Sequence, residues 1–143
     1  MATKILVVED NISISCVVQQ MLADKGFEVS AAADAQEGYL AFLNDRPDVI
    51  LTDIQMPGEN GLELMKRIRI HEPAVRAIYM SGDWISFKSA IEEEERKFRT
   101  RFLRKPFSEE ELMKLLFEFV HSRVTYNNLP FGKPKDKNAL VQA

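Results

Sequence analysis

Five short apolar runs, separated by segments of helical periodicity, limit what this chain can fold into. Two of them, "KILVV" at 4–8 and "VILT" at 49–52, are almost continuously apolar, which is typical of central parallel strands covered on both faces. The other three runs are more polar and lie at 28–31, 76–80 and 101–104. Strict alternation of strand and helix predicts an α/β fold, a doubly wound five-stranded parallel sheet with about five flanking helices.

The segments between these runs carry apolar residues at the i, i+3, i+4 and i+7 spacing of amphipathic helices. Gly26 and Pro47 predict where the first two helices end, and Ser108 with Glu111 predicts a capping box at the start of the last one. The predicted buried stripes are Ile14, Val17, Val18, Met21 and Leu22; Ala35, Gly38, Tyr39, Phe42 and Leu43; Leu64, Met65 and Ile68; and Leu112, Leu115, Leu116, Phe119 and Val120.

The segment 84–100, "WISFKSAIEEEERKFRT", has the weakest apolar pattern. We predict a solvated helix here, because opposite charges recur four residues apart in the favourable order. The predicted pairs are Glu92–Arg96, Glu93–Lys97 and Glu95–Arg99.

Length and composition predict a single soluble domain. The chain has 143 residues, is 45% hydrophobic and carries a formal charge of -3, which argues against a nucleic-acid surface over the whole domain. Its one cysteine, Cys16, lies among apolar residues and is predicted to be buried. No apolar run is long enough to span a membrane and the N-terminus does not read as a signal peptide, so we expect a cytoplasmic protein without membrane contact.

Polar residues stand where four of the five predicted strands end. Glu9 and Asp10 follow the first strand, Asp53 the third, Ser81 the fourth and Lys105 the fifth. Each residue alone could simply cap a helix or turn. Ligands in open α/β sheets bind beyond the carboxyl ends of the strands, so all five together predict a functional site.

Three adjacent carboxylates repel one another unless a cation lies among them. Oxygen ligands favour a hard ion such as Mg²⁺, whereas His71 and His121 lie too far away in the pattern to form a zinc site. A carboxylate beside Mg²⁺ can attack phosphorus and form an aspartyl phosphate. Asp53 is the best nucleophile, because it stands alone at the end of a central strand.

Four segments together resemble the receiver domain of two-component response regulators, the CheY-like family. They are "ILVVEDN", "DVILTDIQMPGENG", "AIYMSGD" and "FLRKPF", and the resemblance runs from Lys4 to about Arg123. It implies the flavodoxin-like strand order 2-1-3-4-5. We therefore expect a receiver domain at 1–123 and a loosely packed or disordered tail at 124–143.

The resemblance also implies roles for the site residues. Asp53 looks like the phosphoacceptor. Asp10 and Asp53 would bind Mg²⁺ through their side chains, Gln55 through its backbone carbonyl and Glu9 through a water molecule.

Five positions match family residues that contact the phosphoryl group, respond to it or tune its loss. Ser81 and Lys105 match the hydroxyl and the lysine that contact it, and Phe102 matches the aromatic switch residue. Gln55 and Asp83 stand where the family tunes dephosphorylation. The chain departs from the family in the charged segment before the fifth strand, in a slightly longer interval from Ser81 to Lys105, and in the absence of a tyrosine hydroxyl at Phe102.

The resemblance implies a signalling switch and not a turnover enzyme. A histidine kinase or phosphotransfer protein would phosphorylate Asp53, and an output partner would bind the face of the fourth helix, fifth strand and fifth helix, with no direct contact to nucleic acid. One alternative is a receiver-fold interaction module that is not phosphorylated. A haloacid dehalogenase-like phosphatase is disfavoured, because Gln55 stands where its second aspartate would be. A flavin-binding protein is also disfavoured, because this chain has no Ser/Thr/Gly phosphate-binding loop after the first strand.

Overall fold

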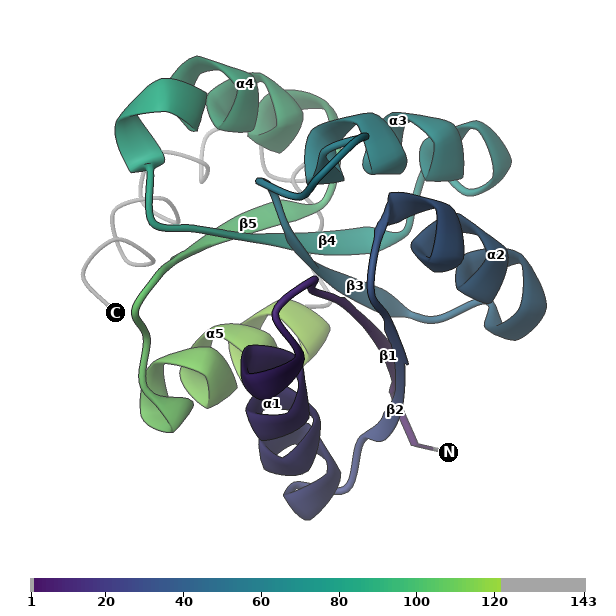
Figure 1. Ribbon diagram of the computed structural model, residues 1–143, viewed down its shortest axis with the longest axis vertical. Coiled ribbons are helices and arrows are strands. Elements are labelled where there is room, and N and C mark those ends of the chain that lie inside the picture. The colour runs from purple at the N-terminus through teal and green to yellow at the C-terminus, as the bar shows by residue number, and fades with distance from the viewer. Residues whose placement is uncertain (1, 122–143) are drawn as a thin grey trace. The chain divides into compact units, whose positions relative to one another are not determined.

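The computed structural model describes residues 2–121, in which five strands alternate with five helices (Figure 1). The elements are β1 (Lys4–Val8), α1 (Ile12–Asp24), β2 (Glu28–Ala32), α2 (Ala35–Asp45), β3 (Val49–Asp53), α3 (Gly61–His71), β4 (Arg76–Ser81), α4 (Trp84–Lys97), β5 (Thr100–Arg104) and α5 (Glu109–His121). All five predicted strands are present. Asp53 and Ser81 are the last residues of β3 and β4, so the sheet itself positions both side chains.

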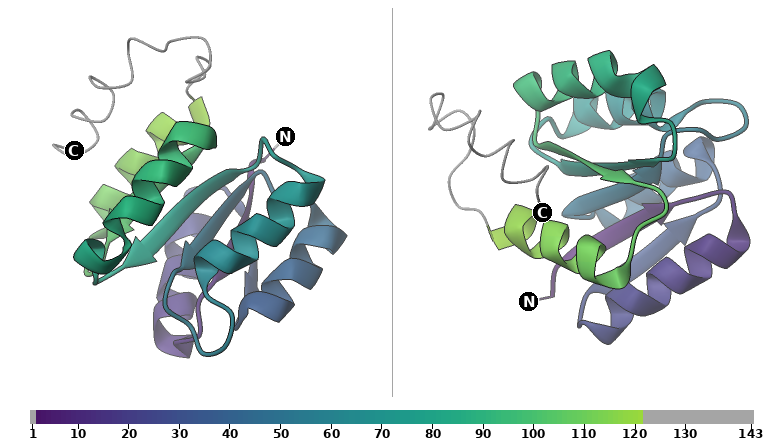
Figure 2. Two further views of the ribbon diagram at one scale, coloured as in Figure 1. Left: turned by 90° about the horizontal axis from the view of Figure 1, so that it is seen from above. Right: turned by 90° about the vertical axis from the view of Figure 1, so that its left-hand side faces the viewer.

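The sheet is parallel throughout and has the order β2-β1-β3-β4-β5, which confirms the predicted topology. The elements from β1 to β5 form one compact unit that ends at Lys105, and α5 belongs to a second unit. Within the first unit, α1 covers one face of the sheet, while α2, α3 and α4 cover the other (Figures 1 and 2).

The main core lies between the sheet and the helices α2, α3 and α4. Alternate residues of β1 point into it, because successive strand side chains face opposite sides. Leu6 and Val8 are fully buried there together with Leu64 and Ile68 of α3. Ile5 and Val7 of β1 and all of β3 are also buried, as their apolar sequence predicted, whereas Lys4 at the start of β1 is exposed.

The predicted stripe of helix α1 is correct at Val18 and Leu22, which are buried, and wrong at Val17. Its buried residues are Ser15, Val18 and Leu22, which follow i, i+3 and i+7 spacing, so Cys16 and Val17 point away from this face. Cys16 is exposed and Val17 is 53% exposed, and the prediction that both are buried is wrong.

Helix α2 ends near the predicted position, with Arg46 in the left-handed conformation just before Pro47. Its predicted stripe is correct at Ala35, Gly38 and Phe42, which are buried. The stripe is wrong at Leu43, which is 37% exposed and lies at its edge.

Helix α4 is present, but it is less solvated than predicted. It ends at Lys97, so Arg99 of the predicted Glu95–Arg99 pair lies beyond the helix. Glu93 and Lys97 do form an exposed ion pair at 3.0 Å. Ile91 is fully buried, and Glu94 three residues later has a side chain only 12% exposed. One face of α4 therefore lies against the domain.

The predicted tail at 124–143 lies outside the described residues. Within the described part of the chain, no helix is both long and apolar enough to cross a membrane.

Candidate functional site

Three carboxylates come together where β1 and β3 end. The two strands are neighbours, with Val8 opposite Thr52, so the residues that follow, Glu9 and Asp53, come out side by side. Glu9, Asp10 and Asp53 each place one carboxylate oxygen within 4.8 Å of the others. Glu9 and Asp53 are buried, at 2% and 6% exposure, whereas Asp10 is exposed. The cluster is thus open to solvent on the side of Asp10.

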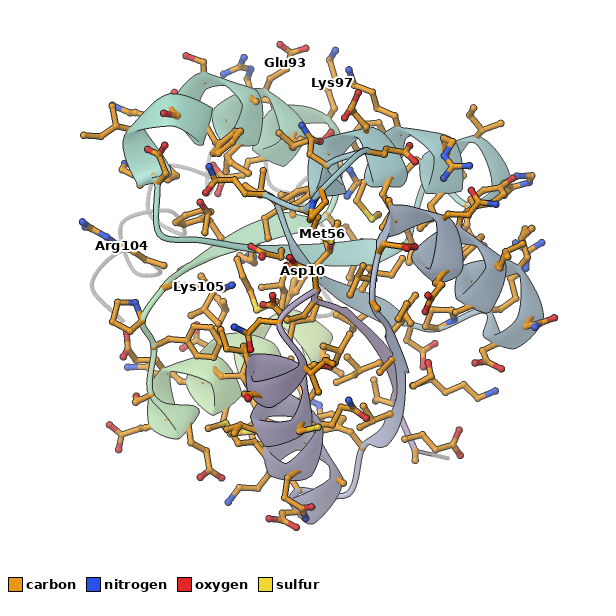
Figure 3. All side chains as sticks on the ribbon, viewed as in Figure 1. Asp10, Met56, Glu93, Lys97, Arg104 and Lys105 are labelled. Atoms are coloured by element: carbon orange, nitrogen blue, oxygen red, sulfur yellow. The ribbon has the colours of Figure 1, made fainter. Side chains whose placement is uncertain are left out.

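Lys105 reaches this acidic cluster from the end of β5. Its Nζ lies 2.8 Å from Oε1 of Glu9 and 3.2 Å from Oδ2 of Asp53. The backbone N–H of Asn11 donates a hydrogen bond of 3.2 Å to the other oxygen of Glu9. Figure 3 labels Asp10 and Lys105, which approach the cluster from the ends of two different strands. The sequence placed Glu9 and Lys105 at the same edge of the sheet, but it did not indicate that Glu9, 96 residues away, is the closer partner of Lys105.

Burial and repulsion perturb the acid at the centre of the cluster. Desolvation, followed by the negative charge of Glu9, raises the pKa of Asp53 from 3.8 to about 6, although the positive charge of Lys105 opposes the shift. Burial lowers the pKa of Lys105, but its hydrogen bond to Glu9 and the charge of Asp53 outweigh this effect, so the net shift is upward. A cation beside Asp53 would relieve the repulsion.

The backbone around Asp53 is held by close packing against the start of α3. Gly61 donates from its N–H to the carbonyl of Ile54 at 2.9 Å, and the hydroxyl of Thr52 donates to the carbonyl of Asp53 at 2.9 Å. A Cβ added at Gly61 would lie 2.3 Å from that same Asp53 carbonyl oxygen. Only glycine fits here without moving the backbone of Asp53.

Ser81 ends β4, and Asp83 lies in the short loop between β4 and α4. Ser81 is 1% exposed, and its Oγ accepts a 2.9 Å hydrogen bond from the N–H of Asp83. The carbonyl of Ser81 accepts a bond of 2.9 Å from the N–H of Lys105, so the two site residues share a backbone link. Asp83 is the N-cap of α4: it accepts from the N–H of Ser86, and hydrogen bonds with Ser86 lower the pKa of Asp83.

The remaining two predicted site residues, Phe102 and Gln55, lie at the edges of this region. Phe102 is half-buried on β5 beside Tyr79 of β4, and its ring centroid lies 4.7 Å from that of Trp84. Gln55 is exposed and follows directly after Asp53 and Ile54. The Trp84–Phe102 contact was not predicted, although an aromatic residue just after Ser81 was a signal for it.

The donor set suits Mg²⁺. All three converging side chains offer oxygen, and a hard cation prefers carboxylate oxygen over nitrogen or sulfur. His71 hydrogen-bonds with Tyr39 between α2 and α3, at 2.7 Å, and is not part of the acidic group. The residues present therefore fit a divalent cation next to a carboxylate and a lysine.

Comparison with known proteins gives matches to one class of signalling domain. The family model described as "Response regulator receiver domain" matches residues 5–117. The DNA-binding transcriptional regulator NtrC of Azospirillum brasilense is 33% identical over 94% of this chain, but the match covers only 27% of NtrC. Sporulation initiation phosphotransferase F of Bacillus subtilis is 29% identical over 57% of this chain and 66% of its own length.

Solved structures match the fold as well. The Vibrio cholerae chemotaxis protein CheY4 superposes with a TM-score of 0.76 and 32% identity, covering 83% of this chain and 99% of its own. A receiver domain protein from Clostridium thermocellum superposes with a TM-score of 0.72 and 27% identity, covering 82% of this chain and 94% of its own.

Proposed function

The chain belongs to the response regulator receiver domain family, and we propose that its phosphorylation-dependent switch works through Asp53 as the phosphoacceptor. One observation carries this assignment: Asp53 is the residue of the cluster that combines a strand end, near-complete burial and an ion pair with Lys105 at 3.2 Å. Glu9 is also buried, but its two oxygens are already engaged by Lys105 and Asn11.

The proposed reaction is transfer from a phosphohistidine of a histidine kinase or phosphotransfer protein. An oxygen of ionised Asp53 attacks phosphorus, a new P–O bond forms, and the P–N bond breaks with its electron pair leaving on the imidazole of the donor. Because a protonated carboxyl is a poor nucleophile, Lys105 assists by opposing the upward shift of the pKa of Asp53.

Lys105 would change partners as the phosphoryl group arrives. It is shared between Glu9 and Asp53, at 2.8 and 3.2 Å. A phosphoryl group on Asp53 adds negative charge within reach of the same ammonium group, so Lys105 would turn toward the phosphoryl oxygens. Glu9 would then need another cation.

Mg²⁺ would supply that cation and would neutralise charge on the phosphoryl oxygens when bound. Asp10 and Asp53 would hold it by their side chains, Gln55 by its backbone carbonyl and Glu9 through a water molecule. The three carboxylates support this assignment, because Glu9, Asp10 and Asp53 each have one oxygen within 4.8 Å of the others.

Phosphorylation would act on a partner-binding surface through Ser81 and Phe102. The Ser81 hydroxyl can still donate its own proton while it accepts from Asp83, so it is available to bond a phosphoryl oxygen. A shift of Ser81 would be accompanied by movement of Phe102, which packs on Trp84. Phosphorylation favours whichever arrangement contacts the phosphoryl group better, and the surface of α4 and β5 would then bind an output protein.

The only catalysis we propose is phosphorylation of the protein itself and the slow loss of its own phosphoryl group. Gln55 and Asp83 would tune the rate of that loss. Asp83 would have this role in addition to capping the N-terminus of α4.

Intact-protein mass spectrometry after incubation with acetyl phosphate tests the proposal. We expect one phosphoryl adduct that requires Mg²⁺, that is absent in Asp53→Asn and that persists in the control Asp45→Asn, an exposed aspartate at the end of α2. If folded wild-type protein gives no adduct with acetyl phosphate or phosphoramidate, the proposal fails and an unphosphorylated interaction module is favoured.

A further inference from the structure

Helix α4 carries an acidic side chain, Glu94, that is much less exposed than that of the adjacent Glu93. Glu94 lies in the run Glu92–Glu95, yet its side chain is 12% exposed, whereas that of Glu93 is 57% exposed. Glu94 follows the fully buried Ile91 by three residues, so both lie on the face of α4 turned toward the domain. A carboxylate in this position needs a partner.

Two buried residues from other elements provide partners for Glu94. The hydroxyl of Tyr79 on β4 donates a hydrogen bond of 2.7 Å to its Oε1, and Arg69 of α3 forms an ion pair with the same oxygen. The side chain of Tyr79 is fully buried and that of Arg69 is 3% exposed. Burial raises the pKa of Tyr79 well above its ordinary value, so the hydroxyl remains a donor.

Arg69 also holds the chain that follows α4. Its Nη2 donates to the hydroxyl of Thr100 at 3.1 Å and to the carbonyl of Arg99 at 3.4 Å. Its guanidinium lies 4.2 Å from the ring centroid of Phe98, the residue that caps the C-terminus of α4. One buried cation therefore joins α3, the C-terminal end of α4 and the start of β5.

The first two turns of α4 have no comparable anchor among the described residues. Ile85 is 86% exposed, and Trp84 and Phe87 are only partly buried against the core. Separating a buried ion pair leaves an uncompensated charge and is strongly unfavourable. Shifting partly buried apolar contacts leaves no unpaired charge. The two halves of α4 are thus held by different kinds of interaction.

We propose that Arg69, Tyr79 and Glu94 form a clamp that fixes the C-terminal half of α4, so that switching displaces only the first turns, residues 84–90. The clamp lies close to the switch, because Tyr79 is two residues before Ser81 on β4 and is the register partner of Phe102. Its fixing role follows from the contacts alone, and its effect on switching rests on the proposed function.

Hydrogen exchange of the unphosphorylated protein tests the fixing role. Glu94→Gln removes the buried charge, and the matched control Glu93→Gln removes the exposed pair with Lys97 on the same helix. Exposed pairs contribute little, so we expect Glu94→Gln to speed exchange of the amides of residues 92–97 by about tenfold or more over Glu93→Gln. Equal exchange in the two variants would overturn the proposal.

If Glu94→Gln fails to fold, hydrogen exchange of Tyr79→Phe tests the same fixing role. It removes the 2.7 Å hydrogen bond but keeps the Arg69–Glu94 pair, so exchange over 92–97 should rise by about threefold or more. No rise in this variant would likewise overturn the clamp.

Adding Mg²⁺ and beryllofluoride, a phosphoryl mimic, tests the effect on switching. We expect exchange to change at residues 84–90 and to stay within about twofold at 92–97. An equal change in both halves would show that the clamp does not limit the motion. If adding Mg²⁺ and beryllofluoride changes no exchange rate, or changes it equally when Asp53 is replaced, the proposed function is contradicted. The exchange rates of the unphosphorylated variants would still decide the fixing role.

Discussion

Replacing Asp53 with Asn is expected to stabilise the metal-free protein at neutral and alkaline pH, although it removes an ion pair. The pKa of Asp53 is raised from 3.8 to about 6, first by burial and then by the charge of Glu9. Ionising this residue is therefore harder in the folded protein than in the unfolded chain. Asn mimics the protonated form, and Lys105 keeps its closer partner, Glu9, at 2.8 Å.

The size and pH dependence of this effect follow from linkage. A pKa raised in the folded state means that stability is fully present below pH 3.8 and is lost as the pH rises through about 6. Each pKa unit corresponds to about 1.4 kcal/mol, so the charged form costs the folded state about 3 kcal/mol. The side chain of Asp53 is only 9% exposed, so solvent screening is small.

Urea denaturation in the presence of EDTA measures the effect. The difference in free energy of unfolding between Asp53→Asn and wild type should rise from near zero around pH 4 to about 3 kcal/mol at about pH 8. The control Asp45→Asn changes an exposed residue and should stay within about 0.5 kcal/mol, with no step near pH 6. Mg²⁺ should stabilise wild type and narrow the gap. Equal or lower stability of Asp53→Asn at about pH 8 would refute the electrostatic reasoning.

Three further predictions concern the site and the residues around it. Mg²⁺ affinity, measured by calorimetry, should fall about tenfold between pH 7 and 5, because ionised Asp53 becomes scarce below its pKa of about 6; an affinity that does not change with pH would argue against Asp53 as a ligand. Gly61→Ala should destabilise the protein by about 2 kcal/mol or more in denaturant melts, because the added Cβ would lie 2.3 Å from the carbonyl oxygen of Asp53. In the control Gly82→Ala the nearest atom is 3.9 Å from the added Cβ, and the loss of stability should be under about 1 kcal/mol. Phosphorylation should change the fluorescence of Trp84, and Phe102→Ala should abolish that change by removing the ring 4.7 Å away; the same signal in both proteins would show that Phe102 does not couple the site to α4.

Much of the fold could be predicted, because its signals are local. The continuous apolar runs of β1 and β3 indicated buried parallel strands, and Asp53 and Lys105 were identified from their places at strand ends. Parallel strands bring such ends to one edge whatever lies between them, so the meeting of Glu9, Asp53 and Lys105 followed from topology alone.

Contacts that depend on distant side chains could not be predicted. The buried face of α1 includes Ser15, a polar residue, so the apolar pattern pointed wrongly to Val17, and Cys16 also lies outside that face. Within the run of glutamates in α4, nothing local separates Glu94 from Glu93. The difference comes from Arg69, which is 25 residues away in the sequence.

Locating the phosphoryl group by borohydride reduction and peptide mapping tests the central claim most directly. Borohydride reduces an acyl phosphate to an alcohol, so protein treated with acetyl phosphate and Mg²⁺ should contain homoserine at position 53. Homoserine at Asp10, or a phosphoryl adduct without any homoserine at position 53, would contradict the assignment of Asp53 as the phosphoacceptor.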